Sequence, residues 1–264
     1  MILTLTIRRC VTNTWMVLDR VTYGIFSAQI HWHGLHQRGT PYSDGFPTQS
    51  QCAVPAKRNM KYNFVADPPG TTFWHAHFHS MNADGLYGPF IVEDEPGSFP
   101  FDYDEERVIL MTDEYGSTSW ELEDYLASPD PNGNPHPDPA PTAGVLCLYD
   151  EKNKTAVTTS CSRGSSGQGF NLNFEPGKVY RLRIISGSII APFIFSIDQH
   201  ELQLVSADYS TLDGTTRVNG VPITVGSGHA SHPLSLTLSN PDWSTIRSHR
   251  QGQDHRPARR NLLG

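Results

Sequence analysis

Two histidine pairs of the form His-x-His place the strongest constraint on what this chain can fold into. The first pair is His31 and His33, and the second is His75 and His77. Side chains at positions i and i+2 of a β-strand point to the same face of the sheet, so each pair presents two imidazoles side by side. Two such strands brought together gather four imidazoles, and neutral imidazole suits copper, zinc or nickel. The spacing therefore predicts a metal site between two strands.

The composition favours many short strands and turns over long helices. The 264 residues include 22 glycines and 20 prolines, and only 18% of them are charged. Apolar and polar residues alternate at 60–64 and 180–184, as in half-buried strands. Thr118 and Glu121 have the spacing of a capping box, so one short helix is expected after them. We expect an all-β fold of β-sandwiches with enough length for two domains.

The second histidine pair is expected to lie on a strand that continues to His79. This strand would carry Phe73, His75, His77 and His79 on one face. Trp74 would point to the opposite face, as Trp32 would on the first strand, and both are interpreted as core residues. His79 is interpreted as a structural residue or a partner outside the ligand set.

Charge and cysteine content exclude several other classes of protein. The net charge of −7 argues against a nucleic-acid partner, and the arginine-rich segment 247–264 is interpreted as a disordered basic tail. The sequence contains no run of about 18 apolar residues, so no membrane span is expected. No signal peptide is visible at the start. Cys10 and Cys52 lie far from other cysteines, whereas Cys147 and Cys161 could close a local loop. No pair has zinc-ligand spacing, and the connectivity stays open.

Segments in both halves resemble the multicopper oxidases, and laccases in particular. In the first half the resemblance rests on Ile30 to Leu35, Asp44-Gly45, Thr48 to Val54, Gly70 to His77 and Asp84 to Phe90. In the second half it rests on Glu175 to Arg183 and on Phe195 to Asp198. The combination of His-x-His-Gly, Trp-His-x-His and a following Asp-Gly-Leu is highly specific to this family.

The resemblance implies a row of cupredoxin domains, each a Greek-key β-sandwich, with a trinuclear copper cluster between the first and third domains. By motif position, His31 would bind the type 2 copper, and His33, His75 and His77 would bind the type 3 pair. Asp84 would be an acid outside the ligand set that helps to move protons while dioxygen is reduced to water. The resemblance also implies secretion.

The chain departs from the family pattern at several positions. The family's third domain supplies a His-Cys-His motif whose cysteine binds the type 1 copper, and no cysteine here is flanked by histidine. Many fungal laccases carry an interdomain disulfide and a phenol-binding acid where this chain has Ala83, Ile190 and Ala191. From about Gly226 the resemblance ends. We therefore expect a fragment with cupredoxin-like domain 1 at 1–98, an incomplete domain 2 at 104–240 and a tail at 241–264.

The expected function is that of a laccase-like, copper-dependent oxidoreductase. In the full-length protein, a small reducing substrate such as a phenol would lose single electrons, and dioxygen would accept them. A third cupredoxin domain is the partner needed to complete the cluster, so this chain alone is expected to be inactive. Two alternatives stay open: a non-catalytic copper-binding protein, and a cupredoxin-like interaction module with an empty site. Asp84 could merely cap a turn, and the four histidines could be structural.

Overall fold

The structure is a computed structural model. It describes residues 29–58, 60–149, 174–190 and most of 192–213, together with short strands outside these ranges. The predicted tail at 241–264 lies outside the described residues.

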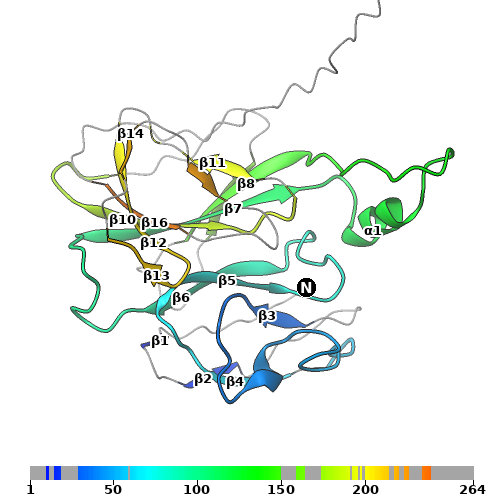
Figure 1. The fold of residues 1–264 in the computed structure, drawn as a ribbon, viewed down its shortest axis with the longest axis horizontal. Coiled ribbons are helices and arrows are strands. Elements are labelled where there is room, and N and C mark those ends of the chain that lie inside the picture. Colours follow the sequence, from blue (N-terminus) through cyan, green and yellow to red (C-terminus); the bar gives the residue numbers. More distant parts are fainter. Residues whose placement is uncertain are drawn as a thin grey trace, which may run out of the picture.

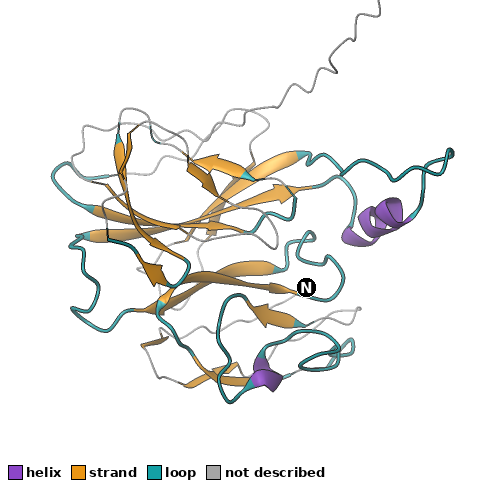
Figure 2. Ribbon diagram, viewed as in Figure 1, coloured by secondary structure: helices purple, strands orange, loops and turns teal. Residues whose placement is uncertain are grey.

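The first half of the chain forms a four-stranded sheet and a two-stranded sheet (Figures 1 and 2). Its elements are β1 (Cys10–Val11), β2 (Trp15–Leu18), β3 (Ile30–Trp32), the 3-10 turn η1 (Pro41–Ser43), β4 (Tyr62–Val65), β5 (Gly70–Ala76) and β6 (Tyr87–Glu93). The strand order is β1-β6-β5-β3 in the larger sheet, and β2 pairs with β4 in the smaller one. The alternation at 60–64 is thus confirmed as strand β4, whose residues alternate between buried and half-buried.

The second half forms a larger sheet and one helix. Its elements are β7 (Glu105–Glu114), α1 (Ser119–Ala127), β8 (Ala143–Tyr149), β9 (Thr159–Arg163), β10 (Tyr180–Ser186), β11 (Phe193–Phe195), β12 (Glu201–Ala207), β13 (Ser210–Thr211), β14 (Arg217–Asn219), β15 (Ile223–Val225) and β16 (Leu234–Leu238). The main strand order is β13-β12-β16-β10-β7-β8-β9, and β14 adds to β12. The all-β prediction is confirmed.

Helix α1 begins where the sequence predicts. The Thr118 hydroxyl accepts a hydrogen bond from the Glu121 amide, and the Glu121 carboxylate accepts one from the Thr118 amide, which completes the capping box. The helix projects from the edge of the second half, toward the end of the first half where β3 and β5 meet (Figure 1). No helical segment in the part of the chain that the structure describes has the length and apolar character that a membrane crossing requires.

The two halves have separate apolar cores and a shared one. Trp32 and Trp74 are both buried in the first core, with Tyr62, Phe64 and Phe90 around Trp32, so their interpretation as core residues is confirmed. A further cluster joins the halves: it includes Phe73 of β5, Leu110 of β7 and Ile185 of β10. Burial of this shared surface holds β5, the strand that carries His75, against the second half.

A buried ion-pair network also joins the halves. Arg181 and Arg183 occupy the polar positions of β10, yet both are almost fully buried. One Nη atom of each lies within 3.2 Å of the Glu106 carboxylate. Arg181 also pairs with Asp94 at 3.3 Å, and Arg183 donates to the Thr71 hydroxyl at 2.7 Å. One face of β10 therefore packs Leu182 and Ile184 into the apolar core of the second half. The other face carries Arg181 and Arg183, which make the charged contact between the halves.

Cys147 of β8 is disulfide-bonded. The register of β8 and β9 places the Cα of Cys161 directly opposite that of Cys147. The register accords with a local link between these positions, which is one of the connectivities that the sequence leaves open.

Candidate metal centre

The two histidine pairs meet where β3 and β5 lie side by side. These strands are antiparallel, and His31 is the register partner of His75, just as Trp32 is of Trp74. Antiparallel partners place their side chains on the same face of the sheet. The tryptophans fill the core on one face, so the histidines gather on the other.

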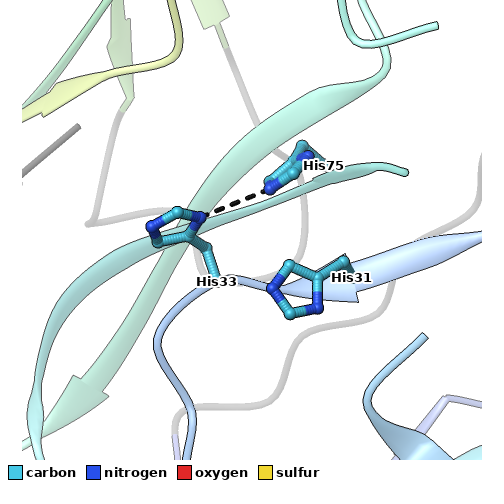
Figure 3. Close-up of side chains that lie close together, drawn as sticks. All are labelled: His31, His33 and His75. Carbon is cyan, nitrogen blue, oxygen red and sulfur yellow. Dashed lines mark hydrogen bonds between the residues drawn. The ribbon is translucent and has the colours of Figure 1, made fainter. Parts of the chain in front are cut away.

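Three of the imidazoles form a compact donor set. One ring nitrogen from each of His31, His33 and His75 lies within 4.8 Å of the other two, and the three rings face a common space (Figure 3). His33 Nδ1 lies 3.4 Å from His75 Nε2. These separations match a group of nitrogens that could share a metal ion or bind two neighbouring ions.

Hydrogen bonds to carbonyl groups fix which nitrogen faces the centre. His31 Nδ1 lies 2.8 Å from the Asp44 carbonyl oxygen, and His75 Nδ1 lies 2.9 Å from the Ala76 carbonyl oxygen. A carbonyl oxygen only accepts, so both Nδ1 atoms carry the proton. Nε2 of each ring is then the nitrogen with a lone pair for a metal. Metal-binding histidines usually donate their other ring N–H to a carbonyl or carboxylate in this way, which fixes the orientation of the ring.

Burial keeps His75 neutral. Removal from water lowers the pKa of His75 from 6.5 to about 3, and the neighbouring imidazoles add to this effect, against the opposing hydrogen bond to Ala76. Metal binding requires neutral imidazole. His75 is therefore in its ligand form well into the acid range.

His77 lies beside the three-histidine group. Its ring centroid is 5.4 Å from that of His31 and 5.5 Å from that of His75, and its ring packs on Phe46 at 4.1 Å. Strand β5 ends at Ala76, so His77 is just beyond the strand rather than within it. All four predicted ligands are thus brought together.

The prediction that the strand continues to His79 is wrong. His79 has a φ of +51° in the turn after β5, which directs the chain away from the ligand face. Its Nδ1 pairs with Glu123 of α1 at 2.7 Å, and its ring stacks on Trp120 at 3.9 Å. His79 therefore links the turn to the helix, in agreement with a structural role.

Asp84 lies against the start of α1. Its Oδ1 accepts a hydrogen bond from the Ser119 amide at 2.9 Å, and its Oδ2 accepts one from the Ser119 hydroxyl at 2.6 Å. A carboxylate at this position satisfies an amide of the first helical turn and interacts well with the helix dipole. Asp84 is also exposed to solvent.

Sequence reasoning assigned no role to two residues that shape the site. Asp44 supplies the carbonyl that orients His31, and Phe46 packs against both His31 and His77. The Asp44-Gly45 motif was the available signal. The motif marks the segment as part of the family pattern, but only the structure shows that the Asp44 carbonyl accepts a hydrogen bond from His31.

Comparison with known proteins places this geometry in a family. Sequence profiles of two multicopper oxidase domains match residues 16–97 and residues 105–229. The chain belongs to the multicopper oxidase family. Members of this family are copper oxidoreductases that use oxygen as acceptor, so the multicopper oxidase assignment accounts for a donor set made of imidazoles.

Relatives of this multicopper oxidase chain include both laccases and ascorbate oxidases. L-ascorbate oxidase of Cucumis sativus is 33% identical over 220 residues, which cover 80% of this chain and 36% of that protein. Laccase-1 of Cryptococcus neoformans var. grubii is 32% identical over 209 residues, which cover 76% of this chain and 32% of that protein. The chain thus spans well under half the length of these relatives.

Solved structures confirm the cupredoxin-like fold. The multicopper oxidase Fet3p, which functions in iron import, superposes with a TM-score of 0.69 and 25% identity, over 93% of this chain and 41% of Fet3p. Laccase from Botrytis aclada superposes with a TM-score of 0.67 and 25% identity, over 89% of this chain and 41% of that chain.

Proposed function

We propose that this chain supplies the first two cupredoxin domains of a laccase-like oxidase, divided between residues 98 and 104. In this proposal His31 binds the type 2 copper, and His33, His75 and His77 bind the type 3 pair. The observation that carries it is the three-nitrogen group within 4.8 Å, built by the β3–β5 pair and bordered by His77. The donor set fits copper because it consists of imidazoles whose Nε2 atoms at His31 and His75 face inward.

The bound copper ions would supply the electron transfer that reduces dioxygen to water. The chain's own contribution is to hold four imidazoles in place and to keep His75 unprotonated through burial. A third cupredoxin domain is the proposed partner that completes the cluster and receives electrons from a small reducing substrate, since no cysteine of these 264 residues is flanked by histidine.

Asp84 is the proposed proton donor of the reaction, because dioxygen reduction consumes protons. Its exposure supports this role, while its contacts to Ser119 also give it a structural one. Two variants of an oxidase assembled with a third domain distinguish the proton-donating role of Asp84 from its structural role. Ser119→Ala removes the hydroxyl contact and leaves the acid, whereas Asp84→Asn removes the acid. The proton role predicts that Asp84→Asn lowers turnover much more than Ser119→Ala does. An equal loss of turnover in both variants would mean that Asp84 only stabilises the start of helix α1.

Secretion is the proposed location. A disulfide-bonded Cys147 is typical of proteins from oxidising compartments, and Asn153-Lys154-Thr155 is a glycosylation sequon. Two experiments test secretion. One measures whether a reducing agent destabilises the purified chain, and the other analyses glycans after expression in a secreting host.

A non-catalytic copper-binding protein is the second candidate, because three ligands of one site come from this chain alone. Titration of the metal-free chain with Cu(II) tests the site that both candidates share. We expect modest, pH-dependent binding that falls at least ~100-fold when His75 and His77 are both replaced by alanine. Replacement of His249 and His255, which lie outside the family motifs, is the control. Unchanged copper stoichiometry in the His75/His77 variant would refute the site. Oxygen consumption after addition of a third domain separates oxidase from binder.

A further inference from the structure

A tyrosine from the second half of the chain reaches the loop that carries His33. Tyr209 lies in the turn between β12 and β13, which Figure 1 shows beside β5 and β6. Its side chain packs against the apolar core of the first half, and its hydroxyl donates to the His33 carbonyl oxygen at 3.2 Å. The Asp208 carbonyl in the same turn accepts from the Thr71 amide at 3.4 Å.

The space for the Tyr209 ring exists because two glycines border it. A Cβ on Gly34 would lie 2.7 Å from Cε2 of the ring, and a Cβ on Gly70 would lie 2.6 Å from Cδ1. Gly34 also has a φ of +77°, which favours glycine. Any larger residue at either position would collide with the ring. We call this space, between Gly34 and Gly70, the glycine slot.

The position of His33 depends on contacts other than the pairing of strand β3. Strand β3 ends at Trp32, so His33 begins the loop instead of continuing the sheet. Its amide donates to the Phe73 carbonyl at 3.1 Å, and its carbonyl accepts from the Thr72 hydroxyl at 2.6 Å as well as from Tyr209. Its imidazole then stacks on Phe73, with the ring centroids 4.7 Å apart.

We infer that Tyr209 is a positioning residue for the copper site: it holds the His33–Gly34 backbone so that the His33 imidazole faces those of His31 and His75. This inference rests on the proposed function, because it assigns Tyr209 to the same ligand set. The second half of the chain thereby contributes to a site whose four ligands within this chain all come from the first half.

The test compares three variants of the full chain by two measurements. Tyr209→Phe keeps the ring in the glycine slot and removes the hydroxyl, and Tyr209→Ala empties the slot. Tyr125→Phe, on an exposed tyrosine of α1, is the matched control. The measurements are Cu(II) affinity with the electron paramagnetic resonance spectrum of the bound ion, and hydrogen exchange of residues 33–35 in the metal-free chain.

We expect Tyr209→Phe to weaken Cu(II) binding by about 10-fold, the low end for loss of a group that supports a ligand, and to change the copper spectrum at an unchanged Tm. Exchange at 33–35 should also accelerate, and Tyr209→Ala should show both effects more strongly. Equal copper affinity and spectra in Tyr209→Phe and Tyr125→Phe would overturn the inference. If the wild-type chain binds no copper, the proposed function fails and exchange alone decides: acceleration at 33–35 supports the positioning role, and unchanged exchange overturns it.

Discussion

His31 and His75 are register partners across the β3–β5 pair, and their imidazole centroids lie 5.4 Å apart. Each ring is anchored through Nδ1 to a main-chain carbonyl, of Asp44 for His31 and of Ala76 for His75. Because the anchors are backbone atoms, the ligand geometry depends on the exact path of the chain around the site. Substitutions that move this path should therefore affect metal binding without touching a histidine.

Gly45 offers the sharpest test of that dependence. It has a φ of +75°, and a Cβ there would overlap the Ile30 carbonyl oxygen, next to His31. We expect Gly45→Ala to destabilise the fold by at least ~3 kcal/mol, from backbone strain and steric overlap together, and to weaken copper binding. Chemical denaturation and Cu(II) titration measure the two effects.

Gly39→Ala is the control for Gly45→Ala. Gly39 has nearly the same φ, +76°, but a Cβ there meets nothing within 4 Å. Its cost should be only the strain of the left-handed backbone, about 1–2 kcal/mol, with copper affinity retained. Equal losses in the two variants would show that overlap with Ile30 has no effect.

The pKa of His75 predicts how the metal-free fold responds to acid. The folded-state value of about 3 is below the ordinary 6.5 of the unfolded chain, so between these values the unfolded state binds the extra proton. His75 therefore lowers the free energy of unfolding as pH falls from about 6.5 toward 3. Thermal unfolding from pH 7 to pH 4 should show a falling Tm, with a smaller slope in His75→Gln. The same slope in both proteins would contradict the assigned burial of His75.

Removal of the Glu106 carboxylate should loosen the contact between the two halves. The Glu106 side chain is only 8% exposed and pairs with Arg181 and Arg183, and burial of an arginine with too few partners is costly. We expect Glu106→Gln to lower the free energy of unfolding by about 3 kcal/mol, measured by urea denaturation. Asp102→Asn, at an exposed carboxylate, is the control and should change it by less than ~0.5 kcal/mol. A small effect at Glu106 would mean that the ion pairs do not hold the halves together.

The purified 264-residue chain should bind copper without laccase turnover. Its cysteines all lack flanking histidines, so the intense blue thiolate-to-copper absorption should also be absent. Absorption spectroscopy of the copper-loaded chain and an oxygen-uptake assay with a phenol check this. Turnover by the chain alone would contradict the need for a third domain.

Local sequence patterns predicted much of this structure correctly. The His-x-His spacing indicated the two ligand strands, and the Thr118/Glu121 pair located the start of α1. These features depend on strand and helix periodicity, which neighbouring residues determine.

The errors and omissions arise where distant segments meet. The strand of His75 was expected to continue to His79, but His79 turns away to pair with Glu123. The alternation at 180–184 predicted a half-buried strand, yet every residue of β10 is buried, and Glu106, Asp94 and Thr71 contact its arginines. The contact of Tyr209 with His33 spans most of the described chain, and no local pattern contains it.

The glycine slot has a consequence for the order in which the protein becomes native during its synthesis. Its walls, at Gly34 and Gly70, leave the ribosome long before the ring that fills it. At about 10 residues per second, the roughly 140 residues that separate Gly70 from Tyr209 take about 14 s to translate. Throughout that interval the nascent first half exposes an unfilled apolar gap beside His33.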